Sequence, residues 1–217
     1  MKVHTLTVGP LETNGYVLEH EGVAVVFDPG DEPERFLDLV NQRNLRVVAI
    51  PLTHGHIDHI GAVGALRAVW PDAPVICHLI DAPMLTSPEL NLSLFMGHKV
   101  KVGEPDQLVE CGEELVFGPI RLEVRCIPGH TPGQVVFVVP EAGVITGDTL
   151  FAGGVGRWDL PGGDGFALIR AIKEQLLTLP DDTMLYPGHG PATTIGREKR
   201  TNPFLKEDFS PETQDFF

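Results

Sequence analysis

The stretch LTHGHIDHIGAVGALRAVW, residues 52–70, decides the fold, because a cluster of metal-binding residue types stands between an apolar strand and a helical pattern. His54, His56, Asp58 and His59 fall within six positions. Two histidines that are two residues apart in a glycine-containing turn differ from helical zinc motifs, in which the histidines are four residues apart. The stretch therefore predicts a strand, a ligand-rich turn and a helix in direct succession.

Three later turns repeat this order of strand and metal-binding side chain. LEVRCIPGH ends in His130, GVITGD ends in Asp148, and TMLYPGH ends in His189. Loops at the carboxyl ends of neighbouring strands share one edge of a sheet, so residues far apart in sequence can converge on a single pocket. Neutral imidazole suits zinc, iron or manganese, and a carboxylate can bridge two cations. The seven side chains together predict a site for two metal ions that share one ligand.

The segments around these turns predict an α/β protein. Branched and aromatic residues predict an antiparallel meander of strands at 2–8, 15–20 and 23–28. Further strands are predicted at 46–53, 113–117, 121–127, 134–139, 143–146 and 183–186. Helices are predicted at 31–45, at 60–70 and at 164–179, the last one capped by Asp164. Residues 79–114 contain three prolines that interrupt any helix, and are expected to form short helices and loops.

Length and composition favour one domain covering residues 1–217, with 42% apolar residues for its core. The net charge of −14 repels phosphate backbones, so no nucleic-acid partner is expected. The N-terminal segment alternates like strands, and no long hydrophobic span is visible, so neither an export signal nor a membrane segment is expected. Cys77, Cys111 and Cys126 make an odd number without a CxxC pair, which favours free thiols and a cytoplasmic location.

Four motifs at the ligand-bearing turns resemble those of the metallo-β-lactamase-fold hydrolases: THGHIDH at 53–59, GHTPG at 129–133, TGDTLF at 146–151 and PGHG at 187–190. The likeness covers nearly the whole chain. FAGGVGRWDLPGGD at 151–164 and TTIGREKRTNPF at 193–204 are most similar to the short, glyoxalase II-like hydroxyacylglutathione hydrolases.

This resemblance implies an αββα sandwich of two mixed β-sheets flanked by helices. It implies two divalent transition-metal ions, zinc in the first place and iron or manganese as alternatives. The implied ligands of the first ion are His54, His56 and His130, those of the second are Asp58, His59 and His189, and Asp148 bridges the two ions.

The activity that the resemblance implies is hydrolysis of a small anionic thioester such as S-lactoylglutathione by a metal-bound hydroxide. Thiolate leaves without a protein acid, and Asp58 is expected to accept a proton as well as to bind metal. Arg157 is expected to bind a substrate carboxylate, with an ion pair to Asp159 as the alternative. Longer family members bind glutathione with a helical C-terminal domain, whereas this chain stops soon after NPF, which leaves glutathione recognition open.

Two other functions remain open on the same scaffold. A persulfide dioxygenase would use only His54, His130 and Asp148 around one iron. A lactam or lactone hydrolase, or a non-catalytic metal-binding relative, is the other alternative. Retention of all seven ligands favours the two-metal hydrolase.

Overall fold

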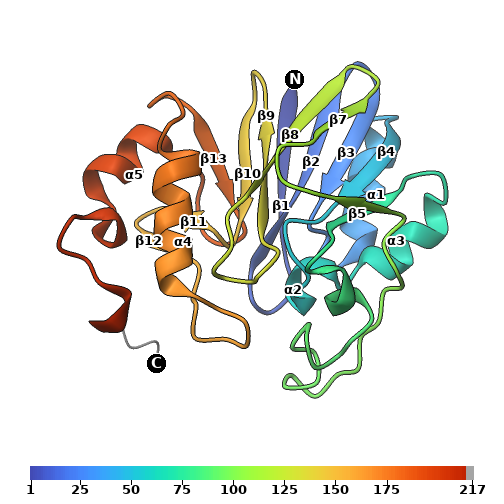
Figure 1. The fold of residues 1–217 in the computed structure, drawn as a ribbon. Coiled ribbons are helices and arrows are strands. Elements are labelled where there is room, and N and C mark those ends of the chain that lie inside the picture. The colour runs from blue at the N-terminus through green and yellow to red at the C-terminus, as the bar shows by residue number, and fades with distance from the viewer. Residues whose placement is uncertain (214–217) are drawn as a thin grey trace.

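Two six-stranded β-sheets packed face to face form the centre of the molecule (Figure 1). The structure is a computed structural model that describes residues 1–213. The first sheet contains, in spatial order, β1 (Lys2–Val8), β2 (Thr13–His20), β3 (Val23–Phe27), β4 (Arg46–Pro51), β5 (Val75–His78) and β6 (Gln107–Val109). The second contains β14 (Thr193–Thr194), β13 (Met184–Pro187), β10 (Gly143–Gly147), β9 (Val135–Val139), β8 (Ile120–Cys126) and β7 (Glu114–Phe117). Both sheets combine antiparallel and parallel pairs.

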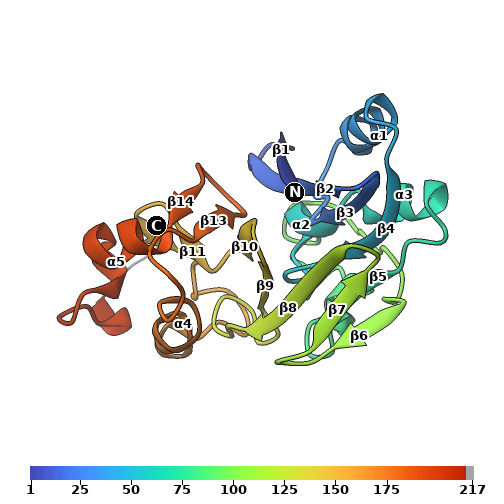
Figure 2. The same cartoon turned by 90° about the horizontal axis from the view of Figure 1, so that it is seen from above.

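Helices cover the outer face of each sheet, as the view from above shows (Figure 2). The first sheet packs against α1 (Pro33–Gln42), α2 (Ile57–Ile60) and α3 (Val63–Val69), and the second packs against α4 (Gly165–Ala171) and α5 (Ile195–Thr201). Smaller elements are two 3₁₀ turns at Ala82–Leu85 and Pro203–Leu205, a π-helical turn at Ile172–Leu176, a further 3₁₀ turn at Pro211–Thr213, and a ribbon of β11 (Leu150–Phe151) and β12 (Gly154–Val155). The predicted αββα sandwich is confirmed. Among residues 1–213, no helix is long and apolar enough to cross a membrane.

The space between the sheets is filled by side chains from alternate strand positions. The rings of Phe27 and Phe137 come from opposite sheets, and their centroids lie 5.5 Å apart. Tyr16 and Tyr186 also come from opposite sheets and form an edge-to-face pair at 5.7 Å. Aromatic pairs of this kind stabilise a core beyond the burial of their area, by about 0.5–1.5 kcal/mol each.

Strand direction explains why the ligand-bearing turns share one end of the sandwich. β8 and β10 are both antiparallel to β9, and β10 is parallel to β13, so β8, β10 and β13 run the same way. Backbone hydrogen bonds join the two sheets at the end of these strands: Val135 N donates to Thr53 O at 2.9 Å, and Asn14 N donates to Gly188 O at 2.7 Å. The turns after β4, β8, β10 and β13 are therefore held against each other.

The helices differ from the prediction in three places, one of which is α5, a helix at Ile195–Thr201 that the sequence analysis did not predict. The segment after the histidine turn is two helices, because Ala62 N donates to Pro29 O at 3.0 Å and the chain at Gly61 lies too close to the backbone of Gly30 for any side chain. The predicted helix at 164–179 does begin at its Asp164 cap, whose side chain accepts a hydrogen bond from Ala167 N. It changes from α-helical to π-helical after Ala171. Within 79–114 the structure adds strand β6, which is parallel to β5.

The cysteine prediction is wrong for two of the three residues. Cys111 and Cys126 form a disulfide with a Cα–Cα distance of 5.3 Å, and Cys77 alone is a free, buried thiol. The bridge joins the connection between β6 and β7 to the last residue of β8. The two residues are 15 positions apart, and only the return of β8 along β7 brings them together. An odd number of cysteines therefore did not exclude a disulfide.

Candidate metal centre

All seven predicted ligands lie together at the common end of the two sheets. The turn after β4 carries His54 and His56, and the short helix α2 that follows carries Asp58 and His59. The other three ligands follow β8, β10 and β13, and are His130, Asp148 and His189. Side chains from both sheets thus meet in one cluster.

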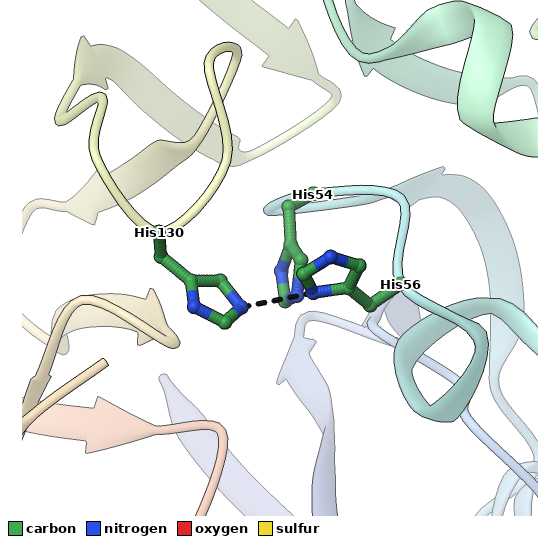
Figure 3. A group of neighbouring side chains, drawn as sticks. All are labelled: His54, His56 and His130. Atoms are coloured by element: carbon green, nitrogen blue, oxygen red, sulfur yellow. Dashed lines mark hydrogen bonds between the residues drawn. The ribbon is translucent and has the colours of Figure 1, made fainter. Parts of the chain in front are cut away.

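The first ligand group consists of His54, His56 and His130, whose ligand atoms lie within 4.8 Å of one another (Figure 3). His56 Nδ1 and His130 Nε2 are 2.9 Å apart and face each other from two separate loops. His54 stands between them with its ring nearly perpendicular to both. All three rings are almost completely buried.

The second ligand group consists of Asp58, His59 and His189, again within 4.8 Å. His189 Nε2 lies 3.3 Å from Asp58 Oδ2. Asp148 stands between the two groups, since its Oδ1 is 3.2 Å from His59 Nε2 and its Oδ2 is 3.6 Å from His130 Nε2. This is the position that a carboxylate shared by two cations requires.

A second layer of polar groups orients the rings. Asp28, which is buried, accepts hydrogen bonds from His59 Nδ1 at 3.1 Å and from the Thr53 backbone N and hydroxyl at 2.8 and 2.6 Å. Because the Thr53 hydroxyl donates its one hydrogen bond to Asp28, its oxygen accepts from His54 Nδ1 at 3.1 Å. Each of these contacts occupies Nδ1 and turns Nε2 toward the cluster.

Backbone carbonyl groups orient two further rings in the same way. His130 Nδ1 donates to Arg157 O at 2.7 Å, and His189 Nδ1 donates to Leu11 O at 3.1 Å. The sequence prediction missed these partners and also missed Asp28. Asp28 directly follows β3, so it showed the same pattern of a carboxylate after a strand. The backbone acceptors left no signal in the sequence, because any residue supplies a carbonyl.

The pKa is lowered for the imidazoles of the first ligand group and raised for those of the second. Burial lowers the pKa of each imidazole in the first ligand group, which keeps the rings in the neutral form that binds metal. Burial alone would also lower the pKa of His189, but hydrogen bonds to Asp148 and Asp58 raise it to about 10. The pKa of both carboxyl groups is lowered, because the nearby imidazoles outweigh the effect of burial. The cluster therefore holds two anionic carboxylates.

The unpartnered atoms of the cluster fit a metal centre. His54 Nε2 is buried and lacks any hydrogen-bond partner among the described residues, and His59 Nε2 and Asp148 Oδ1, although 3.2 Å apart, do not form a hydrogen bond with each other or with another described group. Buried polar atoms of this kind cost about 1–3 kcal/mol each, so a native fold retains them for a reason. Imidazole nitrogens with carboxylate oxygens form a donor set for divalent zinc, iron or manganese.

Two glycines lie against the cluster for reasons of space. A Cβ at Gly188 would lie 2.2 Å from Asp148 Oδ1 and 2.6 Å from His59 Cε1, so only glycine lets this turn approach the ligands. Gly55, which stands between the two histidines of the turn, does not have a left-handed φ. Its hydrogen faces Met84, whose Cβ would lie 2.5 Å from an added Cβ, so close packing accounts for it.

The cluster opens into a cavity of about 740 Å³. Arg157 lies on its wall, but the guanidinium is in a two-pronged ion pair with Asp159, with Nε–Oδ1 and Nη2–Oδ2 distances of 2.7 and 2.6 Å. This pair is the alternative that the sequence left open for Arg157. His98 lines a smaller neighbouring cavity of about 210 Å³, which shares Asp58 with the larger one.

Known proteins are similar to this chain in sequence. The family model described as the metallo-beta-lactamase superfamily matches residues 8–189. The "Probable metallo-hydrolase YqgX" of Bacillus subtilis is 42% identical, over 94% of this chain and 98% of that protein. The "Hydroxyacylglutathione hydrolase GloC" of Haemophilus influenzae is 35% identical, again over 94% and 98%.

Solved structures agree with this assignment. The BLEG-1 B3 metallo-beta-lactamase superposes with a TM-score of 0.91 at 39% identity, covering 94% of this chain and 99% of that one. TTHA1623 in a di-iron-bound form superposes with a TM-score of 0.83 at 45% identity, covering 93% and 100%. The family match, the sandwich fold and the clustered ligands all place this chain in the metallo-β-lactamase superfamily, to which it belongs.

Proposed function

We propose that the chain is a two-metal hydrolase that cleaves a thioester, for which S-lactoylglutathione is the reference substrate. The observation that carries the proposal is the position of Asp148 between two complete ligand groups. A mononuclear dioxygenase would need only His54, His130 and Asp148 and would leave four oriented ligands without a purpose. The name of GloC and the di-iron form of TTHA1623 support the same choice.

The two ligand groups support the ligand assignment that the resemblance implied. His54, His56 and His130 would hold one ion, Asp58, His59 and His189 the other, and Asp148 both. Divalent cations bound here would lower the pKa of a water molecule and polarise the acyl oxygen of the substrate.

The chain's own residues would orient the reaction and handle its proton. Asp58 lines the cavity, and its Oδ2 accepts a hydrogen bond from the Thr13 hydroxyl at 2.9 Å. This contact fixes the carboxylate so that it can accept a proton from the attacking water as well as bind metal. A thiolate leaving group is stable near neutral pH, so the chain needs no separate general acid.

Four measurements test the proposal. Protein from medium supplemented with zinc, iron and manganese is expected to contain about two transition-metal ions per chain and to release thiol from S-lactoylglutathione. Oxygen uptake with glutathione persulfide and hydrolysis of a β-lactam are measured on the same protein. One iron per chain with oxygen uptake, or lactam hydrolysis without thiol release, would overturn the proposal.

His56 separates the two-metal and one-metal mechanisms most directly, because the dioxygenase triad does not include it. His56→Ala is expected to lower metal content and to abolish thiol release. His20→Ala, which alters a half-buried histidine at the end of β2 outside the cluster, is the matched control. Unchanged hydrolysis by His56→Ala would contradict the two-metal assignment.

A further inference from the structure

The wall of the large cavity is apolar next to the metal centre. The metal-binding side chains lie at its base, and hydrocarbon side chains make most of the remaining lining: Leu11, Ile57, Leu92, Phe95, Phe151 and Leu160. Apolar surface around a few convergent polar groups is the usual composition of a site for a small organic ligand. The reactive group of a substrate would meet the ligands, and the rest of it would meet hydrocarbon.

One segment of this wall, residues 91–96, is held in place by buried hydrogen bonds of Asn91 and carries apolar side chains. Asn91 is fully buried, and its side-chain amide donates to Met84 O at 2.9 Å and to Val100 O at 3.0 Å. Its backbone O accepts from Ile57 N, at the start of the helix that carries two of the ligands. In this segment the side chain of Phe95 is 76% exposed, although it borders the cavity. Water therefore covers an aromatic surface that a ligand could cover at a gain in free energy.

Charge on the cavity wall does not favour an anionic substrate tail. Among the described residues that line it, no lysine is present, and Arg157 is the one arginine. Two nitrogens of the Arg157 guanidinium, Nε and Nη2, donate hydrogen bonds to the two oxygens of the Asp159 carboxylate. Glutathione carries carboxylates, and on a protein of net charge −14 these would need a cation on the cavity wall away from the metal ligands to hold them.

We propose that the apolar wall at residues 92–96 binds a hydrocarbon arm of the substrate, so that the thioesters preferred by this site carry an apolar group instead of glutathione. The inference rests on the proposed thioesterase function and names the substrate class of the same site. The hydrocarbon could belong to the acyl part or to the thiol part of the thioester, and both present the same chemistry to the wall.

Two series of substrates identify the arm. One series holds the thiol constant as N-acetylcysteamine and lengthens the acyl group from acetyl to octanoyl, and the other holds acetyl constant and lengthens the alkanethiol. In one of the series kcat/KM is expected to rise about fourfold per methylene, the factor that corresponds to burial of one CH₂. S-Lactoylglutathione is expected to fall below the better members of that series.

Phe95→Ala tests the wall itself. In the series whose kcat/KM rises with chain length, it is expected to lower kcat/KM for the six-carbon member by about tenfold and for the shortest member by much less, because only the longer group reaches the ring. The matched control is Phe166→Ala, which removes a phenylalanine that is 54% exposed on α4 and does not line the cavity. Phe95→Leu, which keeps an apolar side chain, is expected to recover most of the loss.

A binding measurement separates failure of this inference from failure of the proposed function. S-Hexyl-N-acetylcysteamine, a thioether that cannot be hydrolysed, is expected to bind in calorimetry with a negative heat-capacity change and more weakly to Phe95→Ala. Binding of this kind without hydrolysis of any thioester would refute the thioesterase and leave the apolar site standing. Hydrolysis of S-lactoylglutathione combined with flat chain-length series would refute the apolar site and leave the thioesterase standing.

Discussion

Removal of the Cys111–Cys126 disulfide is expected to lower the stability of the protein substantially. The bridge closes a loop between residues that are 15 positions apart, and a loop of that length corresponds to about 3 kcal/mol of lost entropy in the unfolded chain. For a domain of roughly this size, 1 kcal/mol changes Tm by about 2–4 °C. The double variant Cys111→Ser/Cys126→Ser is therefore expected to unfold about 6–12 °C below the wild type.

Thermal unfolding followed by circular dichroism measures this difference, and a reductant supplies the internal control. Wild-type protein in tris(2-carboxyethyl)phosphine is expected to unfold near the temperature of the double variant, and the variant itself is expected to be insensitive to the reductant. Thiol titration of the denatured wild type should detect one thiol before reduction, from Cys77, and three afterwards.

Two results would contradict the predicted loss of stability. If three thiols titrate in protein prepared without reductant, the bridge does not form in solution. If one thiol titrates but the reductant leaves Tm unchanged, the bridge forms and the chain-entropy estimate fails for this loop, as it can where the unfolded state retains structure.

Three further perturbations follow from particular contacts. Asp28→Asn, which weakens the brace behind a ligand histidine, should lower metal affinity about 10–100-fold in a chelator competition, whereas the exposed Asp38→Asn on α1 should not change it. Gly188→Ala should lower metal content and activity together with a retained dichroism spectrum, because its Cβ would overlap two ligands; full occupancy would show that the turn can move. Arg43 lowers the pKa of Glu19 to about 2. Their ion pair therefore stabilises the fold fully at pH values above the ordinary carboxyl pKa of about 4.5, and this contribution is lost as the pH falls from about 4.5 to about 2. Glu19→Gln should therefore cost less than ~1 kcal/mol in urea unfolding near neutral pH and nothing near pH 2; a difference that grows on acidification would reverse the sign of this reasoning.

Local patterns in the sequence were sufficient to predict most elements and the ligand residue types. Alternating apolar residues predicted the strands at 2–8 and 121–127, and the Asp164 cap marked the start of a helix, because strand and helix periodicity are properties of neighbouring residues. The position of a histidine or aspartate directly after each of four strands predicted which side chains would meet, because strand ends share an edge.

Contacts between distant segments could be decided only by the tertiary structure. The alignment of Cys126 beside Cys111 depends on the register of β8 on β7, and the sequence contains no local record of that register. The engagement of Arg157 by Asp159 depends on rotamers, which leave both an ion pair and a substrate contact open when only the residue types are known. The apolar wall depends on Asn91, whose buried side-chain amide donates hydrogen bonds to Met84 O and Val100 O. These bonds hold the segment that contains Phe95 beside the cavity. Sequence determines which groups are present and how each short segment folds, whereas the packing of the two sheets determines which of those groups become neighbours.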